Sequence, residues 1–274
     1  MAEEIFVNDS AFGELLQQIS GQLRSSLVGI HGALQSIAPP ELRDGDKQMD
    51  ERAAVFYKSY YRLLRLCNNL ADVTAPESAM CLRMVNDDIV GICREVMERA
   101  EYPAEMLGLK TAFQCDRKTQ IIAVDAEGIQ RMLLNLLSNA FKFTPRGGSV
   151  TLAVQVLPDV VELKLTDTGV GIAPELLDTV FERYATPTRE DAPPHGMGFG
   201  LPISRRIARV HGGGLVLYSQ PGRGTTVTVT LPNRKNRTQA LRTLAVDYSG
   251  GFNTTLVELS DVLPDAAFTQ KFLD

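Results

Sequence analysis

Two asparagines, Asn135 and Asn139, lie four residues apart in a segment that favours a helix. On a helix, residues four apart project from the same face, one turn from each other. Their amide oxygens are hard ligands that suit Mg²⁺, an ion that also keeps water and substrate oxygens in its shell. A solvated polar stripe would explain either residue alone, but the run 132–137 around Asn135 is otherwise apolar. The pair therefore favours a metal-assisted binding site.

A second segment, Asp167-Thr-Gly169-Val-Gly171, follows a predicted strand that ends at Thr166. Glycine has no β-carbon, so it lets the chain turn tightly and brings backbone close to a ligand. Asp-x-Gly-x-Gly alone is a common turn. Here it gains weight because it lies between the asparagine pair and a third segment.

The third segment, Gly196-Met-Gly198-Phe-Gly200, leads into a helix predicted to begin at Leu201. Free backbone amides and a helix N-terminus together attract anionic oxygens such as those of phosphates. Dinucleotide-binding folds use similar glycines, but the preceding strand and the parallel βαβ unit that they require are missing. The three segments together predict a pocket for a nucleotide with its divalent cation.

In this order and spacing, the segments resemble the ATP-binding domain of sensor histidine kinases, the group shared with gyrase, the Hsp90 chaperones and MutL. The resemblance covers residues 84–232 and implies ATP and Mg²⁺ as cofactors. It implies that Asn139 is the metal ligand and that Asn135 supports it or a water near the terminal phosphate. It further implies that Lys142 faces the phosphates.

The resemblance also assigns residues around the base. Asp167 would accept the adenine amino hydrogen, and Thr225 would support that contact. Residues 181–184 resemble the family's phenylalanine box, and residues 185–195 would form a lid. The nucleotide-binding residues implied in this way are Asn135, Lys142, Asp167, Gly169, Gly171, Tyr184, Gly196, Gly198, Gly200, Leu201 and Thr225.

The resemblance breaks down upstream. Histidine kinases carry Ser-His-Glu-Leu-Arg-Thr-Pro-Leu in a first helix, where the histidine accepts the γ-phosphoryl group. The matching segment here starts Ser20-Gly21-Gln22, so the nucleophile and its neighbouring carboxylate are both replaced. His31 would require a quite different docking of the ATP-binding domain, and His211 matches a structural histidine of the family. We therefore expect no catalytic residue at the usual position and no autophosphorylation there.

Two groups of elements must position these residues. Over residues 12–37, apolar side chains recur in steps of three and four, which is typical of a helix with one core-facing seam. Pro39 and Pro40 end that helix, and a second seam runs over residues 56–74. Two such helices have too little apolar surface to close alone, so the pattern predicts a homodimer with a four-helix bundle.

The remaining patterns predict an α+β fold, with helices over a mixed sheet in a sandwich of the histidine kinase type. The helices expected are 87–99, 126–143, 173–181 and 201–210, and the strands are 111–114, 121–124, 149–157, 160–166, 214–219 and 225–231.

The expected domains are a dimerisation hairpin over residues 1–78, an ATPase domain over 79–232 and a C-terminal extension over 233–274. In the extension, residues 241–248 and 254–259 alternate like two strands of a hairpin, and a short helix is expected after Pro264.

Composition narrows the function classes. The 274 residues carry a net charge of −5 and no lysine or arginine block of the kind that neutralises nucleic-acid phosphates. No apolar run reaches the ~18 residues of a membrane span, and the first residues do not resemble a signal peptide. The four cysteines and three histidines lack zinc-site spacing. The sequence predicts a cytoplasmic protein without a nucleic-acid partner.

The leading hypothesis is a histidine-kinase-like signalling protein that binds Mg-ATP. Nucleotide binding would serve as a conformational switch, or the protein would act by pairing with a partner kinase or a response regulator. One alternative is an active kinase that phosphorylates a residue in another protein. The other is a scaffold whose pocket no longer binds nucleotide.

Overall fold

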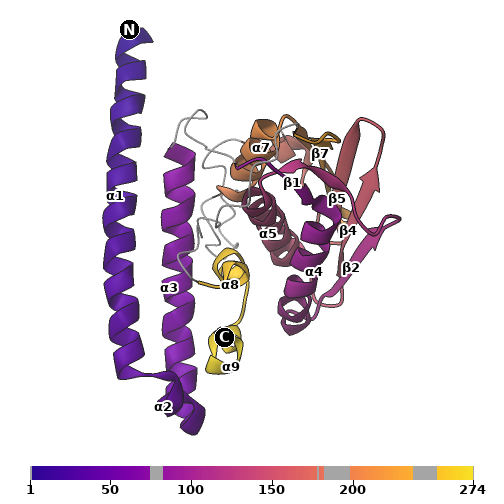
Figure 1. The fold of residues 1–274 in the computed structure, drawn as a ribbon. Helices are drawn as coiled ribbons and strands as arrows, with labels where there is room; N and C mark the ends of the chain where they lie inside the picture. The colour runs from indigo at the N-terminus through magenta and orange to yellow at the C-terminus, as the bar shows by residue number, and fades with distance from the viewer. Residues whose placement is uncertain (1, 75–82, 178, 182–197, 237–251, 274) are drawn as a thin grey trace. The chain divides into compact units, whose positions relative to one another are not determined.

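The computed structural model describes residues 2–74, 83–177, 179–181, 198–236 and 252–273 (Figure 1). The chain divides into two compact units. One, the helical unit, comprises Met1–Met80 and Pro264–Asp274, and the other, the sheet unit, comprises Cys81–Leu263. The extension predicted over residues 233–274 is therefore shared between the two units.

The helical unit is a hairpin of two long helices, α1 (Ala2–Ile37) and α3 (Lys47–Thr74), joined by the short helix α2 (Pro40–Gly45). The prolines at 39 and 40 end α1 as predicted. Pro40 is the first residue of α2, a position at which a backbone N–H would have no acceptor within the helix. The segment between the two long helices is thus partly helical. None of the helices in the described parts of the chain is long and apolar enough to span a membrane.

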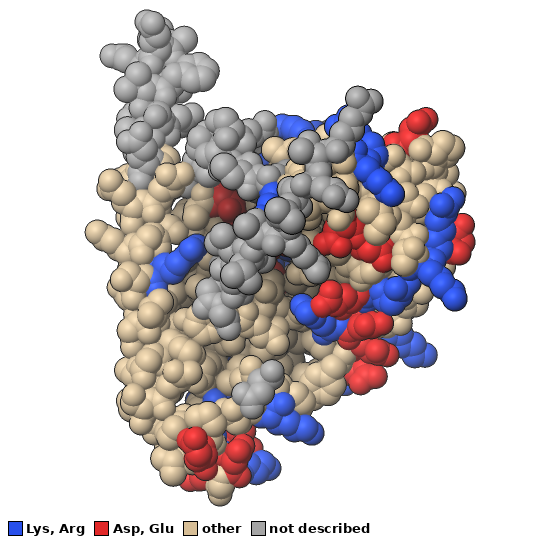
Figure 2. All heavy atoms as spheres, in the orientation of Figure 1, with Lys and Arg blue, Asp and Glu red and all other residues tan. Residues whose placement is uncertain are grey.

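The apolar seam predicted on α1 is only partly buried. Leu27 is 5% exposed, whereas Leu23 and Ile30 are 47% and 43% exposed. Figure 2 shows few charged side chains along the described part of α1 and α3 that faces the viewer. The hairpin therefore leaves much of its apolar surface uncovered. Among the side chains that the structure describes, the exposed large apolar residues of α1 and α3 are Leu15, Ile19, Leu23, Val28, Ile30, Ile37, Val55, Phe56 and Leu63.

The end of the chain packs on this hairpin. The 3₁₀ helix η2 (Asp265–Phe268) contacts α3, and α9 (Gln270–Leu273) follows it. The short helix predicted after Pro264 is thereby confirmed. The side chain of Phe268 is completely buried, with its ring 5.5 Å from that of Tyr61 on α3.

The strand predicted over residues 254–259 is wrong, because this segment forms helix α8 (Thr254–Leu259). The Asn253 side chain accepts hydrogen bonds from the N–H groups of Thr255 (3.0 Å) and Leu256 (3.2 Å). Such a cap starts a helix, and the alternation of six residues is too short to distinguish a strand from a buried helix. The strand predicted over 241–248 lies outside the described residues.

The sheet unit contains a mixed sheet, as predicted, and this sheet has five strands. Its strand order is β2-β4-β5-β7-β6, in which only the pair β2 and β4 is parallel. The strands are β2 (Lys110–Cys115), β4 (Ser149–Val156), β5 (Val160–Asp167), β6 (Gly214–Gln220) and β7 (Gly224–Pro232).

Three helices cover one face of this sheet (Figure 1): α4 (Ile89–Met106), α5 (Ala126–Phe143) and α7 (Gly200–Val210). The core lies between these layers, because every second residue of the inner strands is buried, as in Val150, Leu152 and Val154 of β4. The α+β fold predicted from the sequence is therefore present.

Some boundaries differ from the predictions. Helix α4 begins after Asp88, whose side chain accepts a hydrogen bond from the N–H of Val90, and it runs past Pro103. Helix α6 (Pro174–Leu177) covers only part of the helix predicted over residues 173–181. The sequence did not predict β1 (Val85–Asp88), which pairs with β3 (Ile121–Val124) in a separate two-stranded sheet.

Candidate functional site

The predicted asparagine pair and the third glycine segment meet where α5 faces the start of α7. The side chain of Asn135 is completely buried, and Asn139 lies one turn further along α5. A β-carbon on Gly200, the first residue of α7, would lie 3.4 Å from Oδ1 of Asn135 and 3.7 Å from Nδ2 of Asn139. A larger side chain at Gly200 would therefore occupy the space in front of both amides.

Lys142 follows Asn139 by three residues in the last turn of α5, so both lie on one side of the helix. Its ammonium group is 4.8 Å from the centroid of the Phe143 ring. Gly198 has a φ of 72°, a backbone conformation that favours glycine, and Leu201 belongs to the first turn of α7. Tyr184, Gly196 and the predicted lid 185–195 lie outside the described residues.

Asp167 ends β5, and backbone donors fix its carboxylate. Its Oδ1 accepts hydrogen bonds from the N–H groups of Gly169 (2.8 Å) and Thr225 (3.2 Å). Burial raises the pKa of the Asp167 carboxyl above its ordinary value, while the hydrogen bonds from these two N–H groups act in the opposite direction. The second segment and Thr225 are thus brought together around one oriented carboxyl group.

The glycines near Asp167 permit backbone segments to touch. A β-carbon added to Gly169 would lie 2.5 Å from the carbonyl oxygen of Phe143. A β-carbon added to Gly171 would lie 2.1 Å from the carbonyl oxygen of Gln220. At Gly224, it would lie 2.0 Å from the carbonyl oxygen of Asp167. The sequence predicted that Gly169 and Gly171 bring backbone close to a ligand. Within the protein, they also make room for the backbone of Phe143 and Gln220 and, at Gly169, for the Asp167 carboxylate.

Sequence reasoning missed Ser219, which connects three of these segments. Its hydroxyl accepts a hydrogen bond from the N–H of Ile172 (2.8 Å) and donates to the carbonyl of Gly224 (3.0 Å). It also lies 2.9 Å from Oγ1 of Thr225. A serine at the end of a strand gives no sequence signal for such contacts, since their partners are distant in the chain.

His211 ties the beginning of α5 to the end of α7. Its Nε2 accepts a hydrogen bond from the N–H of Asp125 (3.1 Å), and its Nδ1 is 2.8 Å from the carbonyl oxygen of Ile207. This pattern requires the neutral ring with the proton on Nδ1. Burial lowers the pKa of His211, which also favours the neutral form. His211 therefore holds together α5, which carries the two asparagines, and α7, which begins at Gly200.

Gly21 and Gln22, which the resemblance aligns with the phosphoaccepting histidine and its neighbour, lie on an exposed stretch of α1. Gly21 and Gln22 are both exposed, and a β-carbon on Gly21 would meet no atom within 4 Å. His31 is half-buried, with its ring 5.2 Å from Tyr60 and 5.9 Å from Tyr57. Burial lowers the pKa of His31. His31 thus belongs to an aromatic cluster between α1 and α3.

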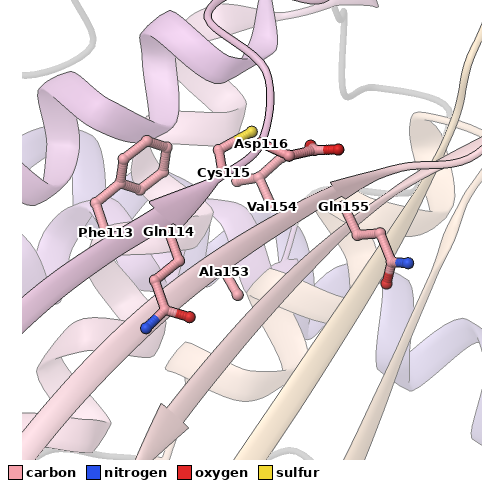
Figure 3. A pocket seen from close by; sticks show the side chains of 7 residues that line it. All are labelled: Phe113, Gln114, Cys115, Asp116, Ala153, Val154 and Gln155. Atoms are coloured by element: carbon pink, nitrogen blue, oxygen red, sulfur yellow. The ribbon is translucent and has the colours of Figure 1, made fainter.

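A hollow lies on the sheet, at β2 and β4 (Figure 3). It contains none of the residues predicted to bind nucleotide. Its lining consists of Phe113, Gln114, Cys115, Asp116, Ala153, Val154 and Gln155. Within the described residues, no three His, Cys, Asp or Glu side chains gather in a way that could hold a metal ion.

Comparison with known proteins agrees with this geometry. The chain is 33% identical over 236 residues to the "Non-motile and phage-resistance protein" of Caulobacter vibrioides, covering 82% of this chain and 28% of that protein. It is 30% identical to "Histidine protein kinase DivJ" of the same organism, covering 79% of this chain and 36% of the relative. The chain thus spans about a third of the length of these curated relatives.

A solved structure shares the fold. Full-length ShkA, whose crystal structure is a complex with AMPPNP, superposes with a TM-score of 0.63 at 24% identity, over 83% of this chain and 47% of ShkA. Residues 124–235, which begin just before α5 and end just beyond β7, match the family model "Histidine kinase-, DNA gyrase B-, and HSP90-like ATPase". This part of the chain, residues 124–235, is therefore a domain of the histidine kinase-, DNA gyrase B- and HSP90-like ATPase family.

Proposed function

We propose that this protein is a histidine-kinase-like signalling protein whose sheet unit binds ATP with Mg²⁺ and whose helical unit does not autophosphorylate at the usual position. The observation that carries the proposal is the convergence of Asn135, Asn139 and Gly200 where α5 faces the start of α7. ShkA, which shares the fold, was crystallised with the ATP analogue AMPPNP, and this supports the same class of ligand here.

The residues fit a nucleotide with its cation. The Asp167 carboxyl would accept the adenine amino hydrogen, because the N–H groups of Gly169 and Thr225 already hold its orientation. Asn139 would ligate Mg²⁺ through its amide oxygen, and the remaining ligands would be phosphate oxygens and water. The cation, when bound, would neutralise charge on the phosphates. Lys142 would add a second positive charge on the same side of α5.

The absence of a phosphoacceptor rests on the chemistry of two adjacent positions. Gly21 offers no nucleophile, and Gln22 offers no carboxylate that could take up a proton. The His31 ring is packed beside Tyr57 and Tyr60, which suits a structural role in the hairpin. Nucleotide binding would then serve as a conformational signal that is passed to a partner kinase or a response regulator.

The test is incubation of the purified protein with γ-labelled ATP and Mg²⁺, followed by measurement of nucleotide binding and of acid-labile label on the protein. We expect binding without label. Asp167→Asn should lose binding by at least tenfold, because an amide replaces the oriented acceptor. Unchanged affinity in this variant would contradict the site, and label on the unaltered protein would contradict the role given to Gly21.

The same assay separates the alternatives. Label that appears on an added partner protein, and only while Asn139 is intact, would favour an active kinase with an external acceptor. Failure of the unaltered protein to bind nucleotide would favour a scaffold.

We further propose that the helical unit forms a homodimer. Among their described side chains, helices α1 and α3 expose nine large apolar ones, three of which, Leu23, Ile30 and Leu63, are 43–50% exposed. A second copy of the hairpin would cover such a surface in a four-helix bundle. Sedimentation equilibrium should give twice the chain mass, and Leu23→Glu with Leu63→Glu should shift it to the monomer. A monomeric unaltered protein would refute this assembly.

A further inference from the structure

The C-terminal segment is anchored in the sheet unit through α8. Helix α8 packs against α5, and its residues Thr255–Leu259 are all buried. The carboxylate of Glu258 is completely buried and lies 3.5 Å from Nε of Arg131 on α5. Arg131 precedes Asn135 by one turn, so this ion pair contacts the helix that carries the asparagines. Separating two buried charges without water is costly, so this ion pair keeps α8 in a fixed position on α5.

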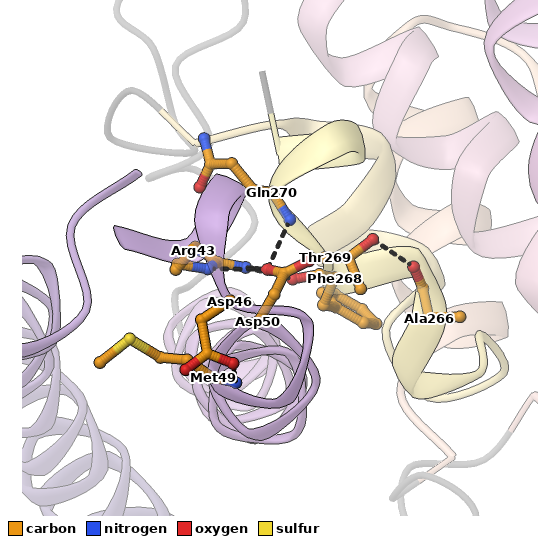
Figure 4. A network of polar contacts seen from close by, with 8 residues as sticks. All are labelled: Arg43, Asp46, Met49, Asp50, Ala266, Phe268, Thr269 and Gln270. Carbon is orange, nitrogen blue, oxygen red and sulfur yellow. Dashed lines mark hydrogen bonds and ion pairs between the residues drawn. The ribbon is translucent and has the colours of Figure 1, made fainter. Parts of the chain in front are cut away.

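The same segment is anchored in the helical unit through η2 and α9 (Figure 4). The guanidinium of Arg43 is buried, lies 2.7 Å from the Asp50 carboxylate and donates to the carbonyl of Phe268 (3.1 Å). Oδ1 of Asp50 also accepts a hydrogen bond from the N–H of Gln270 (3.0 Å). The C-terminal backbone thus forms hydrogen bonds with both members of the Arg43–Asp50 pair, which lies where α2 meets α3.

A second contact reinforces this anchor. The Lys58 ammonium on α3 lies 2.8 Å from the Asp265 carboxylate at the start of η2. The Phe268 ring is completely buried near Tyr61. Apolar burial and two charged contacts therefore hold the segment to α2 and α3.

Only residues 260–264 join the two anchors. Even fully extended, the connection from Leu259 to Asp265 spans at most ~20 Å. The chain also passes from the helical unit to the sheet unit between Met80 and Cys81. Two covalent crossings restrict the relative motion of two units far more than one crossing does.

We propose that residues 252–273 form a strap that couples helix α5 of the sheet unit to helix α3 of the helical unit. A shift of α5 on nucleotide binding is transmitted through Arg131 and Glu258 to α8, and from there to η2 on the hairpin. The nucleotide-dependent part of this inference rests on the proposed ATP binding, whereas the mechanical coupling does not.

The test lengthens the connection and leaves both anchors intact. Twelve glycine and serine residues are inserted between Leu263 and Pro264, and a matched control carries the same twelve residues after Asp274. Circular dichroism checks that both variants keep their helical content. In scanning calorimetry, we expect one coupled transition for the unaltered protein and the control, and two for the insertion variant. Identical calorimetric profiles for all three proteins would overturn the strap.

The second measurement is hydrogen exchange in α3 with and without AMPPNP. We expect the nucleotide to slow exchange around Lys58 and Tyr61 in the unaltered protein and the control, and to lose this effect in the insertion variant. If nucleotide binds but exchange in α3 is unchanged in the unaltered protein, the proposed transmission is wrong. If no nucleotide binds, the proposed function fails, and the calorimetric result still decides whether the strap couples the units.

Discussion

Glycines in the two units have opposite surroundings. In the sheet unit, a β-carbon on Gly171 would lie 2.1 Å from the backbone of Gln220, and one on Gly224 would lie 2.0 Å from that of Asp167. In the helical unit, a β-carbon on Gly21 would meet no atom within 4 Å. The segments around Asp167 are thus fixed by backbone contacts that exclude every other residue. The surface around Gly21 is an exposed helix face with room for larger side chains.

The two units also differ in how they are completed. The sheet unit buries a layered core between three helices and a sheet, and α8 adds to it. The helical unit leaves apolar side chains of α1 and α3 exposed, and it relies on Phe268 from the end of the chain to cover Tyr61. We conclude that the sheet unit is specified mainly by its own contacts, whereas the hairpin depends on segments from elsewhere.

The largest expected effect tests the backbone contacts of the sheet unit. Gly224→Ala places a β-carbon against the Asp167 carbonyl and forces alanine to a φ of 87°. We expect a loss of about 4 kcal/mol in the free energy of unfolding, measured by urea denaturation followed by circular dichroism.

Gly222→Ala is the matched control for this effect. Gly222 has a φ of 74°, but a β-carbon there would meet no atom within 4 Å. Only the backbone strain remains, so we expect a loss of about 1 kcal/mol. Equal losses at the two positions would show that close backbone approach does not distinguish Gly224.

The next effect tests whether the helical unit depends on the end of the chain. Phe268→Ala removes a completely buried ring from α3 and should cost about 3 kcal/mol in unfolding free energy. Phe272→Ala, at a half-buried position, should cost less than half as much. Both are measured at one protein concentration, because a dimer's stability depends on it. An unfolding free energy unchanged by Phe268→Ala would show that the stability of the hairpin does not depend on the C-terminal segment.

A smaller effect concerns the polar contact that joins α5 and α7. Since burial lowers the pKa of His211, the folded state binds fewer protons than the unfolded chain as pH falls below ~6.5. The stabilising contribution of neutral His211 is complete above that pH and is lost as pH falls through the folded pKa. Each unit of lowering corresponds to about 1.4 kcal/mol.

The effect of His211 on stability must be separated from that of other titrating groups, so two proteins are compared at each pH. The carboxyls of Asp125 and Asp167 have raised pKa values, so their contribution to stability changes with pH in the opposite direction. Unfolding free energies of the unaltered protein and His211→Gln should therefore be compared from pH 7.5 to 5. We expect the advantage of the unaltered protein to shrink as pH falls. A difference independent of pH would mean that the His211 pKa is not lowered.

The sequence predicted the elements with strong local signals. Helix α5 has the predicted bounds because its apolar periodicity extends over five turns. The mixed sheet followed from strands with regular alternation. Helix α8 was missed because six alternating residues carry no reliable period, and β1 because its four residues, Val-Asn-Asp-Asp, carry no apolar pattern.

The contacts that complete the site were beyond prediction, since they join residues far apart in the chain. The approach of Gly224 to Asp167 and the pairing of Glu258 with Arg131 follow from no spacing or composition. The predicted asparagines, by contrast, could be recognised because both lie on a single helix. Residues on one element are visible in a pattern, whereas partners across elements need the fold.

The smallest expected effect is an increase in the unfolding free energy, and it concerns Gly21 in the helical unit. Gly21 is an exposed residue within α1, and a β-carbon there meets no atom within 4 Å. Alanine loses less backbone entropy than glycine on forming a helix, so Gly21→Ala should raise the unfolding free energy by about 1 kcal/mol. Gly21→His with Gln22→Glu should likewise fold. If the sheet unit binds ATP as proposed, this double variant should gain acid-labile label from γ-labelled ATP, and Gly21→Ala should not. A Gly21→Ala variant less stable than the unaltered protein would show that α1 needs glycine at this position, and the contrast with Gly224 would fail.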